Sequence, residues 1–439
     1  MSGAGGVDDE TLTAEERRRL QSLLAQPLVA EVFAALESEH ARIVGGAVRN
    51  ALLGEPVQDI DFATTWPPEE VMRRLSRAGF SMHPVGLDHG SVLAAKDERT
   101  FEITTLRRDV KTDGRHAVVA YTDDWAEDAR RRDFTMNALY LDAEGQLHDP
   151  VGGLADARAR RLRFIGDAAW RMREDYLRIL RYFRFLAQYA ADAPEDLKTL
   201  AVIARERAGL QRISKERIRA EMQKLLTAPG AAHALELMLR TGVADAVFPP
   251  DCTQDMVALE RMMAQDAALA LEPDWLLRLL AFCGVRDSLK AAFKLTRAEM
   301  QRLVLLRRML VESGALPGDE HGWQALAYRA GMEGVRDVAR LAAARGQVSE
   351  DALQGVIDLL RRWQPPAFAL RGRDVLALGI APGAAVGELL RRVEERWIAQ
   401  GFRPQDRAGL LALLKQEARA LRGAKKQHQK KNGKEGRQA

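Results

Sequence analysis

The sequence predicts an α+β protein, in which a small mixed-sheet head is followed by a neck, a body and a tail built only from helices. Short apolar runs typical of strands are confined to the first part of the chain, at residues 42–44, 59–62, 80–86, 91–96 and 100–106. Beyond residue 166, apolar residues recur at helical spacing and are interrupted at Gly and Pro. With 439 residues, the chain is too long for one core, so several domains are expected.

We divide the chain into an N-terminal extension, a head, a helical neck, a helical body and tail, and a basic end, at residues 1–25, 26–165, 166–265, 266–420 and 421–439. The basic end holds seven Lys and Arg residues and one Glu, whereas the rest of the chain carries a net charge of −2. It has no apolar periodicity, so we expect it to be disordered. Such a segment either contacts RNA phosphates or only keeps the protein soluble.

Composition excludes several classes of protein. Hydrophobic residues make up 47% of the chain, but no apolar run approaches the length of a membrane span. Residues 1–10 are small and acidic and lack the regions of a signal peptide. Cys252 and Cys283 do not indicate a disulfide framework and cannot alone form a zinc site, so we expect reduced core residues and a cytoplasmic protein.

A pair of glycines, Gly45 and Gly46, lies between a predicted strand and a predicted helix at residues 47–53. Two glycines let the backbone approach a ligand closely, and the free N–H groups of a helix start suit a phosphate. Arg49 lies one helical turn further on, where it can meet the same anion. The pattern therefore predicts a phosphate cradle, although a tight turn would use the same residues.

Three acidic residues follow the cradle. Asp59 and Asp61 are two apart on a predicted strand, so their side chains point the same way. Convergent carboxylates beside a phosphate cradle suit Mg²⁺, which takes oxygen ligands and substrate phosphates. Glu102, on the strand at 100–106, is a candidate third catalytic carboxylate, or else a surface acid.

Two further blocks contain basic residues beside hydrogen-bonding residues. In the sequence EDARRRDFTMNALY, residues 130–132 are arginines that can bind phosphate, and Asp133 with Asn137 can meet a ribose or orient those arginines. Between the two carboxylate-bearing strands and this block, residues 107–116 are charged and lack apolar periodicity, which predicts a mobile loop.

The second block, residues 170–189, predicts one long helix. Its polar residues Asp175, Arg178, Arg181 and Arg184 are three apart and form a slowly turning stripe. An ionised Asp only accepts hydrogen bonds and an Arg only donates them. Cytosine and adenine both present an amino donor beside a ring-nitrogen acceptor, so Asp175 and Arg178 can match these two bases and reject uracil and guanine. The simpler alternative is a surface salt bridge between the two residues.

Together, GGAVRN, the Asp59-x-Asp61 pair, RRRDFTMN and EDYLR resemble the class II tRNA nucleotidyltransferase (CCA-adding enzyme) and bacterial poly(A) polymerase family, which belongs to the superfamily of DNA polymerase β. The resemblance covers about residues 30–225. It implies that the glycines bind the incoming triphosphate, that Asp59 and Asp61 hold two Mg²⁺ ions and that Arg132 contacts the nucleotide. Asn50 stands where the family usually has Asp, and we expect it to be structural.

The resemblance implies an enzyme that adds C, C and A to the 3′ end of tRNA from CTP and ATP, releasing pyrophosphate. It implies no stable protein partner. The segment VGLDHGSV, residues 85–92, resembles CCA-adding enzymes more than poly(A) polymerases. Poly(A) addition, partial CC or A addition, and an RNA-binding protein with an inactive head remain alternatives. Residues 232–421 contain no catalytic pattern, so we expect this part to grip tRNA by shape and phosphate contacts.

Overall fold

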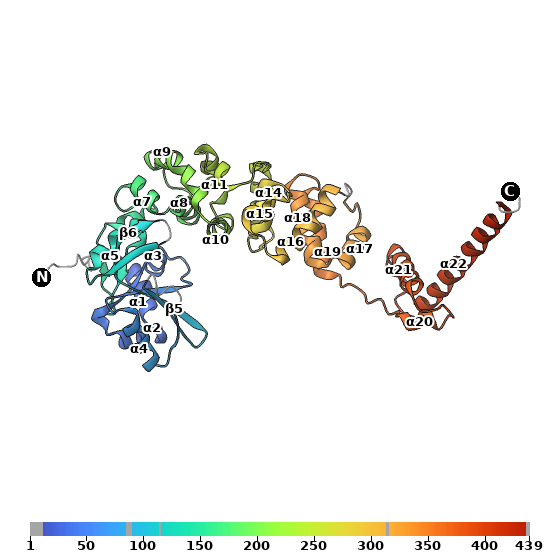
Figure 1. The fold of residues 1–439 in the computed structure, drawn as a ribbon, viewed down its shortest axis with the longest axis horizontal. Coiled ribbons are helices and arrows are strands. Elements are labelled where there is room, and N and C mark those ends of the chain that lie inside the picture. Colours follow the sequence, from blue (N-terminus) through green and yellow to red (C-terminus); the bar gives the residue numbers. More distant parts are fainter. Residues whose placement is uncertain (1–11, 85–89, 114–115, 313–315, 436–439) are drawn as a thin grey trace. The chain divides into compact units, whose positions relative to one another are not determined.

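The computed structural model describes residues 12–84, 90–113, 116–312 and 316–435. The chain divides into two compact units. The first consists of Met1–Met256, Glu272–Leu279 and Asp287–Leu295, and the second of Val257–Leu271, Leu280–Arg286 and Thr296–Ala439. Within the described residues all strands belong to the first unit, so the predicted α+β class with a helical remainder is confirmed (Figure 1).

A mixed sheet of seven strands forms the head, in the order β3-β4-β5-β2-β1-β8-β9. The strands are β1 Ala41–Val44, β2 Ile60–Thr64, β3 Ser81–His83, β4 Ser91–Lys96, β5 Arg99–Thr105, β8 Tyr140–Leu141 and β9 Leu147–His148. Strand β2 pairs antiparallel with β1 and parallel with β5, so Asp61 lies opposite Val44 on one side and Glu102 on the other. The register therefore brings two predicted acidic residues onto neighbouring strands.

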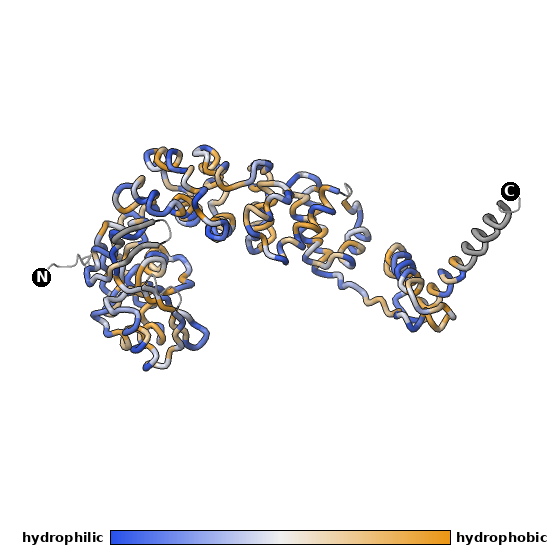
Figure 2. The backbone as a smooth tube through the Cα atoms, viewed as in Figure 1, coloured by the Kyte–Doolittle hydropathy of each residue, from blue (hydrophilic) through white to orange (hydrophobic). Residues whose placement is uncertain are grey.

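Amphipathic helices cover this sheet, and apolar and polar residues alternate along their tubes in Figure 2. They are α1 Ala14–Leu24, α2 Pro27–Leu36, α3 Gly46–Leu53, α4 Pro68–Arg77, α5 Trp125–Arg130 and α6 Gly153–Arg158, with the 3₁₀ turns η2 Ser38–His40 and η4 Thr135–Asn137. The expected helices within 11–40 are confirmed. Phe33 of α2 packs edge-on against the buried Phe62 of β2, with ring centroids 5.1 Å apart.

The first unit continues into helices of the neck. They are α7 Ala168–Glu174, α8 Leu177–Tyr189, α9 Leu197–Glu206, η5 Arg207–Arg212, α10 Lys215–Leu226, α11 Ala231–Arg240 and α12 Val243–Val247. The prediction of one unbroken helix over 170–189 is wrong. Asp175 has an extended backbone, with φ −154° and ψ 105°, and its carboxylate accepts the Leu177 N–H at 3.1 Å. Short acidic side chains compete with the backbone for hydrogen bonds, which explains the break.

Helices make up the remainder of the described chain. They are α13 Met256–Ala268, α14 Trp275–Cys283, α15 Ser288–Phe293, α16 Arg297–Arg307, the π-helix η6 Arg308–Glu312, α17 Glu320–Ala330, α18 Met332–Ala344, α19 Glu350–Arg362, α20 Gly372–Leu376, α21 Ala384–Ala399 and α22 Arg407–Glu435. The buried Trp397 of α21 and Leu410 and Leu414 of α22 belong to one apolar cluster.

Three expectations need correction or fall outside the described residues. Residues 421–435, expected to be disordered, continue α22, because Lys, Gln and Arg are good helix formers once packing has begun the helix. The predicted loop at 107–116 is instead a hairpin of β6 Arg107–Asp113 and β7 His116–Tyr121, since a backbone ladder needs no apolar periodicity. Residues 85–89 of the segment VGLDHGSV lie outside the described residues.

The cysteines also differ from expectation. Neither is free, and both are disulfide-bonded. Cys283 is fully buried at the end of α14, as expected, whereas Cys252 is half-buried in a loop. The sequence alone gave no indication that either cysteine is bonded, because disulfide formation is decided by the fold. Among the described residues, no helix is long and apolar enough to cross a membrane.

The N-terminal helix α1 is fixed to α6 by an ion pair that makes its attachment depend on pH. Arg158 donates to both carboxylate oxygens of Glu16, at 2.8 and 2.7 Å, and this bond with Arg158 lowers the Glu16 pKa to about 2 from its ordinary 4.5. A lowered pKa adds stability above about pH 4.5, and this contribution is lost as the pH falls towards 2.

We therefore expect Glu16→Gln to lower the free energy of unfolding at neutral pH by about 1 kcal/mol, since Arg158 is partly exposed. The difference from the parent chain should shrink below pH 4.5. Urea unfolding across this pH range measures it, with the exposed Glu15→Gln as the control. An effect that stays constant with pH would rule out the ion pair as its cause.

Candidate functional site

One cavity of about 960 Å³ in the first unit collects nearly all of the predicted site residues. Its walls come from α3 and β2 of the head and from α8 and α10 of the neck. The predicted site residues that line it are Gly45, Gly46, Arg49, Asp59, Asp61, Arg132, Asp133, Asn137, Asp175, Arg178, Arg181 and Arg184. Only Glu102 of the predicted set is not in this lining.

The two glycines form the turn that leads into α3. Gly45 has φ 72° and ψ −121°, a backbone region that side chains strongly disfavour, and its N–H donates to the Leu139 carbonyl at 3.0 Å. Gly46 is the first residue of α3, and Arg49 follows one turn later, its N–H bonded to the Gly45 carbonyl at 3.0 Å. The start of α3 therefore faces the cavity.

The two glycines should respond differently to substitution. We expect Gly45→Ala to lower the free energy of unfolding by about 1–3 kcal/mol, because alanine must adopt the positive φ. Gly46→Ala should leave stability nearly unchanged, since a Cβ there would meet only the end of Arg49, at 3.7 Å. Thermal unfolding of both variants checks this. Equal stability of the two would contradict the strained turn.

The acidic residues gather beside this turn. Asp59 immediately precedes β2 and Asp61 is its second residue. Burial, with the neighbouring Glu102 and Asp59, raises the Asp61 pKa to about 6, against the opposing effect of Arg132. Repelling carboxylates in a half-enclosed cavity are stabilised by a bound cation, and their oxygens are ligands that Mg²⁺ accepts. The donor set thus fits a divalent ion.

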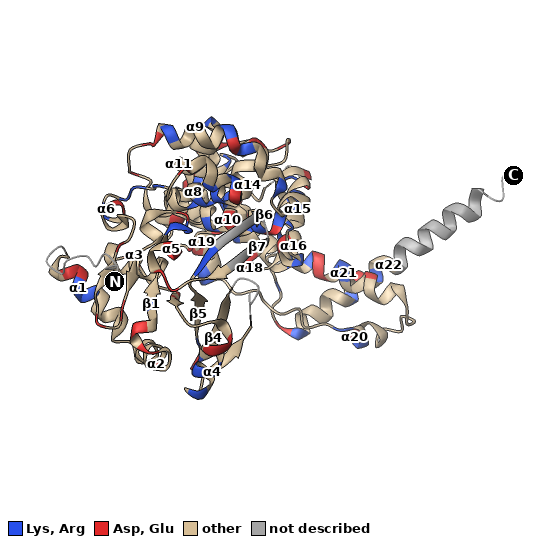
Figure 3. Cartoon of the chain, turned by 60° about the vertical axis from the view of Figure 1, so that its left-hand side comes forward, with Lys and Arg blue, Asp and Glu red and all other residues tan. Residues whose placement is uncertain are grey.

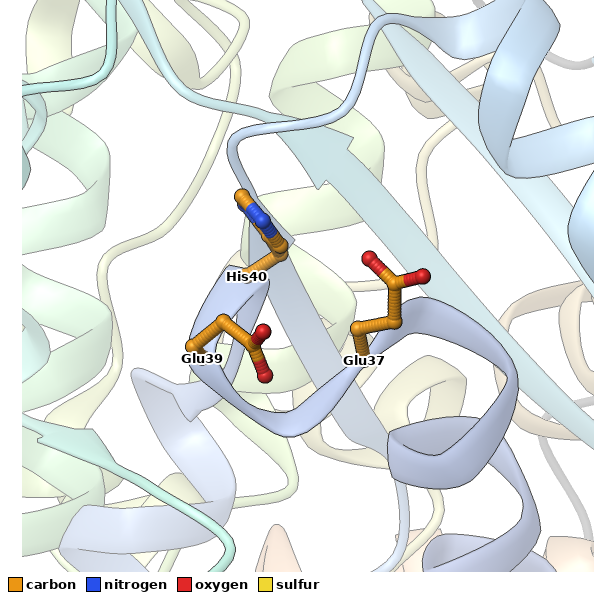
Figure 4. Close-up of side chains that lie close together, drawn as sticks. All are labelled: Glu37, Glu39 and His40. Atoms are coloured by element: carbon orange, nitrogen blue, oxygen red, sulfur yellow. The ribbon is translucent and has the colours of Figure 1, made fainter.

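A second group of acidic residues in the head lies outside the cavity lining. Among the described residues, the one set of three potential ligands within 4.8 Å of one another is Glu37, Glu39 and His40 (Figure 4). Both glutamates are exposed, Glu37 pairs with Arg74 at 2.8 Å, and the His40 Nδ1 lies 2.6 Å from the Thr65 hydroxyl. None of the three lines the cavity. We therefore assign no function to them.

Arg132 is fixed by two buried residues that sequence reasoning missed. It donates to the Asp128 carboxylate, at 3.2 Å from Nε and 3.0 Å from Nη2, and Nε also donates to the Tyr140 hydroxyl at 3.1 Å. Burial alone would raise the Asp128 pKa, but Arg132 and Arg131 lower it to about 2. The remaining Nη1 lies beside Gly45, 3.8 Å from where a Cβ would be. Asp128 precedes Arg132 by four residues, a helical spacing that could have revealed it.

Asp133 and Asn137 orient arginines, although not those of the 130–132 block that we expected them to orient. Asp133 accepts from the Arg181 Nε at 2.7 Å and from the Asn137 amide at 3.1 Å. Burial would raise the Asp133 pKa, but Arg181 and Asn137 hold it well below its usual range. Asn137 in turn accepts a hydrogen bond from Arg49. A continuous chain of bonds thus joins α3 of the head to α8 of the neck.

Arg49 is 4% exposed and forms no ion pair with any described carboxylate. Besides Asn137, it donates to the Tyr189 hydroxyl at 2.8 Å and to the Asn50 side-chain oxygen at 2.9 Å, and it lies 4.1 Å from the Tyr189 ring centroid. Asn50 also donates to the Pro56 carbonyl at 2.7 Å, which is the structural contact expected of it. The guanidinium is therefore fixed while its charge remains unneutralised.

Asp175 and Arg178 do not pair with each other, so the simple salt-bridge interpretation is wrong. Asp175 accepts two bonds from Arg217, at 3.2 and 2.6 Å. Arg178 donates from Nη1 to Glu174 and, at 2.7 Å, to the Arg171 carbonyl. Its Nε and Nη2 form no hydrogen bond within the described residues. Each of the two residues is thus held by another partner at the cavity wall.

Basic residues recur along α8, coloured blue in Figure 3. Arg184 pairs with Glu221 of α10 at 2.7 Å, and Arg181 lies 3.8 Å from the same carboxylate. Helix α10 also lines the cavity, through Arg217 and Lys224. Its residues Arg217, Glu221 and Lys224 are spaced four and three apart, which places them on one helical face, and that spacing could have predicted a shared role.

Comparisons with known proteins agree with this site. The sequence profile described as "Poly A polymerase head domain" matches residues 41–163. The profile described as "Probable RNA and SrmB- binding site of polymerase A" matches residues 196–253. The first includes the glycine turn, the acidic pair and the arginine block, and the second includes α10.

The chain is also similar over most of its length to curated proteins. It is 36% identical over 389 residues to "CCA tRNA nucleotidyltransferase 1, mitochondrial" of Danio rerio, covering 87% of this chain and 88% of the relative. It is 33% identical over 417 residues to "CCA-adding enzyme" of Streptococcus sanguinis, covering 93% and 99%. The solved Bacillus stearothermophilus CCA-adding enzyme in complex with CTP matches with a TM-score of 0.71 and 28% identity, covering 91% of this chain and all of that one.

Proposed function

Because this chain belongs to the family of CCA-adding tRNA nucleotidyltransferases, we propose that its cavity adds C, C and A in turn to the 3′ end of tRNA, from CTP and ATP and without a nucleic-acid template. The observation that carries this proposal is the meeting of three groups in one cavity: the glycine turn, the acidic pair and the Asp175–Arg178 set. These groups supply, respectively, phosphate binding, metal binding and base selection.

Asp59 and Asp61 would hold two Mg²⁺ ions. When bound, such ions lower the pKa of the RNA 3′ hydroxyl and neutralise the departing pyrophosphate. Glu102 faces Asp61 from β5 and adds negative charge beside this pair without lining the cavity. We therefore give Glu102 an electrostatic role through Asp61, while Asp59 and Asp61 bind the ions.

The triphosphate would lie against the glycine turn. The start of α3 presents backbone N–H groups there, and Nη1 of Arg132, which has no hydrogen bond to any described residue, lies beside Gly45. Arg49 adds a buried positive charge one turn into the helix. Asp133 and Asn137 keep Arg49 and Arg181 in place, and the remaining acceptor capacity of Asp133 suits a ribose hydroxyl.

Base selection would use Asp175 as acceptor and Arg178 as donor. Because Arg217 and Glu174 hold these side chains, their geometry is set before a nucleotide binds. Cytosine and adenine satisfy both groups, whereas uracil and guanine would leave charged groups unpaired in the cavity. A site built on such hydrogen bonds can reject the wrong partner strongly.

The helical body and tail, taken as residues 266–420, would recognise tRNA by its shape and its phosphates. The head and the neck, at 26–165 and 166–265, would act on the 3′ end of the same tRNA. No stable protein partner is required for this chemistry. A cytoplasmic location is likewise our proposal, and relatives named mitochondrial make subcellular fractionation its direct test.

A second candidate, poly(A) addition, is supported by the description of the matched head profile. Labelled CTP or ATP, supplied singly to tRNA transcripts ending at the discriminator base, at C or at CC, separates the candidates. The proposal expects CMP transfer to the first two ends and AMP transfer to the third. AMP added repeatedly to every end would indicate a poly(A) polymerase, transfer to only some ends would indicate a partial enzyme, and no transfer would favour an RNA-binding protein.

A further inference from the structure

Helices α8 and α10 pack together and carry matched polar residues along their facing sides. Arg217 meets Asp175, just before α8, and four residues later Glu221 meets Arg184 and Arg181. The pairs advance in the same direction along both helices. Lys224 is three residues beyond Glu221 in the same direction, and it lines the cavity together with Gln188 of the last turn of α8.

The charge balance differs around Lys224. In the two sets of pairs that precede it along the helices, each arginine has a carboxylate partner. Lys224 is exposed and forms no ion pair with the described residues, and Gln188 is neutral. Arg49, which contacts Tyr189 of the same α8 turn, also has no carboxylate partner in the described part of the chain. Glu55, the acid in this part of the lining, is already paired with Arg160 at 2.8 Å.

Two unneutralised cations at one end of a cavity indicate a polyanion there. The base-selecting residues are at the other end of α8, and the ten residue steps from Arg178 to Gln188 span about 15 Å of helix. A nucleoside triphosphate with its base at Arg178 and its reacting phosphate near Asp61 directs its terminal phosphates towards Arg49 and Lys224.

We propose that Lys224 binds the terminal phosphates of the incoming nucleotide and, after transfer, the pyrophosphate product; this rests on the function proposed above. Buried Arg49 is a fixed cation, whereas Lys224 is an exposed point charge on a flexible stem. The flexible Lys224 side chain can therefore stay in contact with pyrophosphate as the product leaves the cavity. The proposal thus adds a neck residue to the phosphate site formed by the head.

The test compares the full chain with Lys224→Met, which removes the charge but keeps the length, and with Lys224→Arg, which keeps the charge. Lys215→Met is the matched control, because Lys215 is an exposed lysine on the same helix outside the cavity lining. Binding of inorganic pyrophosphate with Mg²⁺ is measured by calorimetry. The KM for CTP and for tRNA and the affinity for CMP are measured alongside.

For Lys224→Met we expect the pyrophosphate Kd and the CTP KM each to rise about tenfold, with CMP affinity and the KM for tRNA within twofold of the parent. Lys224→Arg should recover most of the loss. Unchanged pyrophosphate binding would overturn the proposal, and so would a rise confined to the KM for tRNA or a loss shared by CMP. Failure of the parent chain to transfer CMP would instead overturn the proposed function, whereas pyrophosphate binding would still report on Lys224.

Discussion

Asp61→Asn is expected to reduce nucleotide incorporation by about 10³-fold or more. The amide keeps the size of the side chain but removes the charge that would hold a metal ion, and metal stabilisation of the transferring phosphate is worth several kcal/mol. Binding of tRNA should remain nearly unchanged, because Asp61 lies in the cavity that we propose to bind the nucleotide. Single-turnover incorporation of CMP and a filter-binding titration with tRNA measure the two quantities.

The control for this variant is Glu69→Gln, an exposed acid on α4 outside the cavity lining. It should incorporate CMP at the parent rate. The unfolding temperature of Asp61→Asn should not fall, since the substitution removes a half-buried charge that repels Glu102 and Asp59. Incorporation within tenfold of the parent would contradict the assignment of Asp61 as a metal ligand.

Arg178→Ala is expected to lose base selectivity more than catalytic rate. The variant lacks the donor that matches the ring nitrogen of cytosine and adenine, a charged hydrogen bond worth about 1.5–3 kcal/mol. The preference for CTP over UTP, measured as the ratio of kcat/KM values, should therefore fall by roughly 10- to 100-fold. Competition assays with CTP against UTP, and ATP against GTP, give these ratios.

Arg173→Ala is the matched control, because Arg173 lies on α7 and pairs with Glu206 away from the cavity. Its selectivity should equal that of the parent. If Arg178→Ala still rejects UTP and GTP as strongly as the parent while losing rate, then Arg178 does not act as the donor that selects the base.

Sequence alone predicted those site residues whose roles depend on local spacing. Gly45 and Gly46 before a helix, Asp59 and Asp61 on one strand, and the stripe that includes Arg178 are all recognisable within a few residues of chain. The structure brings them to one cavity. Strands β1 to β5 and the amphipathic helices within 11–40 were predicted for the same reason, since their periodicities are local.

Residues that act through distant partners were missed. Arg217 holds Asp175 from 42 positions away, and Tyr189 contacts Arg49 from 140 positions away. No spacing rule predicts such pairs, because tertiary packing creates them. The break at Asp175 was missed because the apolar periodicity continues through it. Only the structure shows its extended backbone and the hydrogen bond that its carboxylate accepts from the Leu177 N–H.

The most direct test of the central claim is sequencing of the 3′ ends of tRNA transcripts that end at the discriminator base, after incubation with the full chain, Mg²⁺, CTP and ATP together. Addition directed by the cavity predicts one dominant end, CCA, with no further extension. Lengthening adenosine tails, or transcripts that stop at CC, would contradict the proposal that this chain completes and ends the CCA sequence.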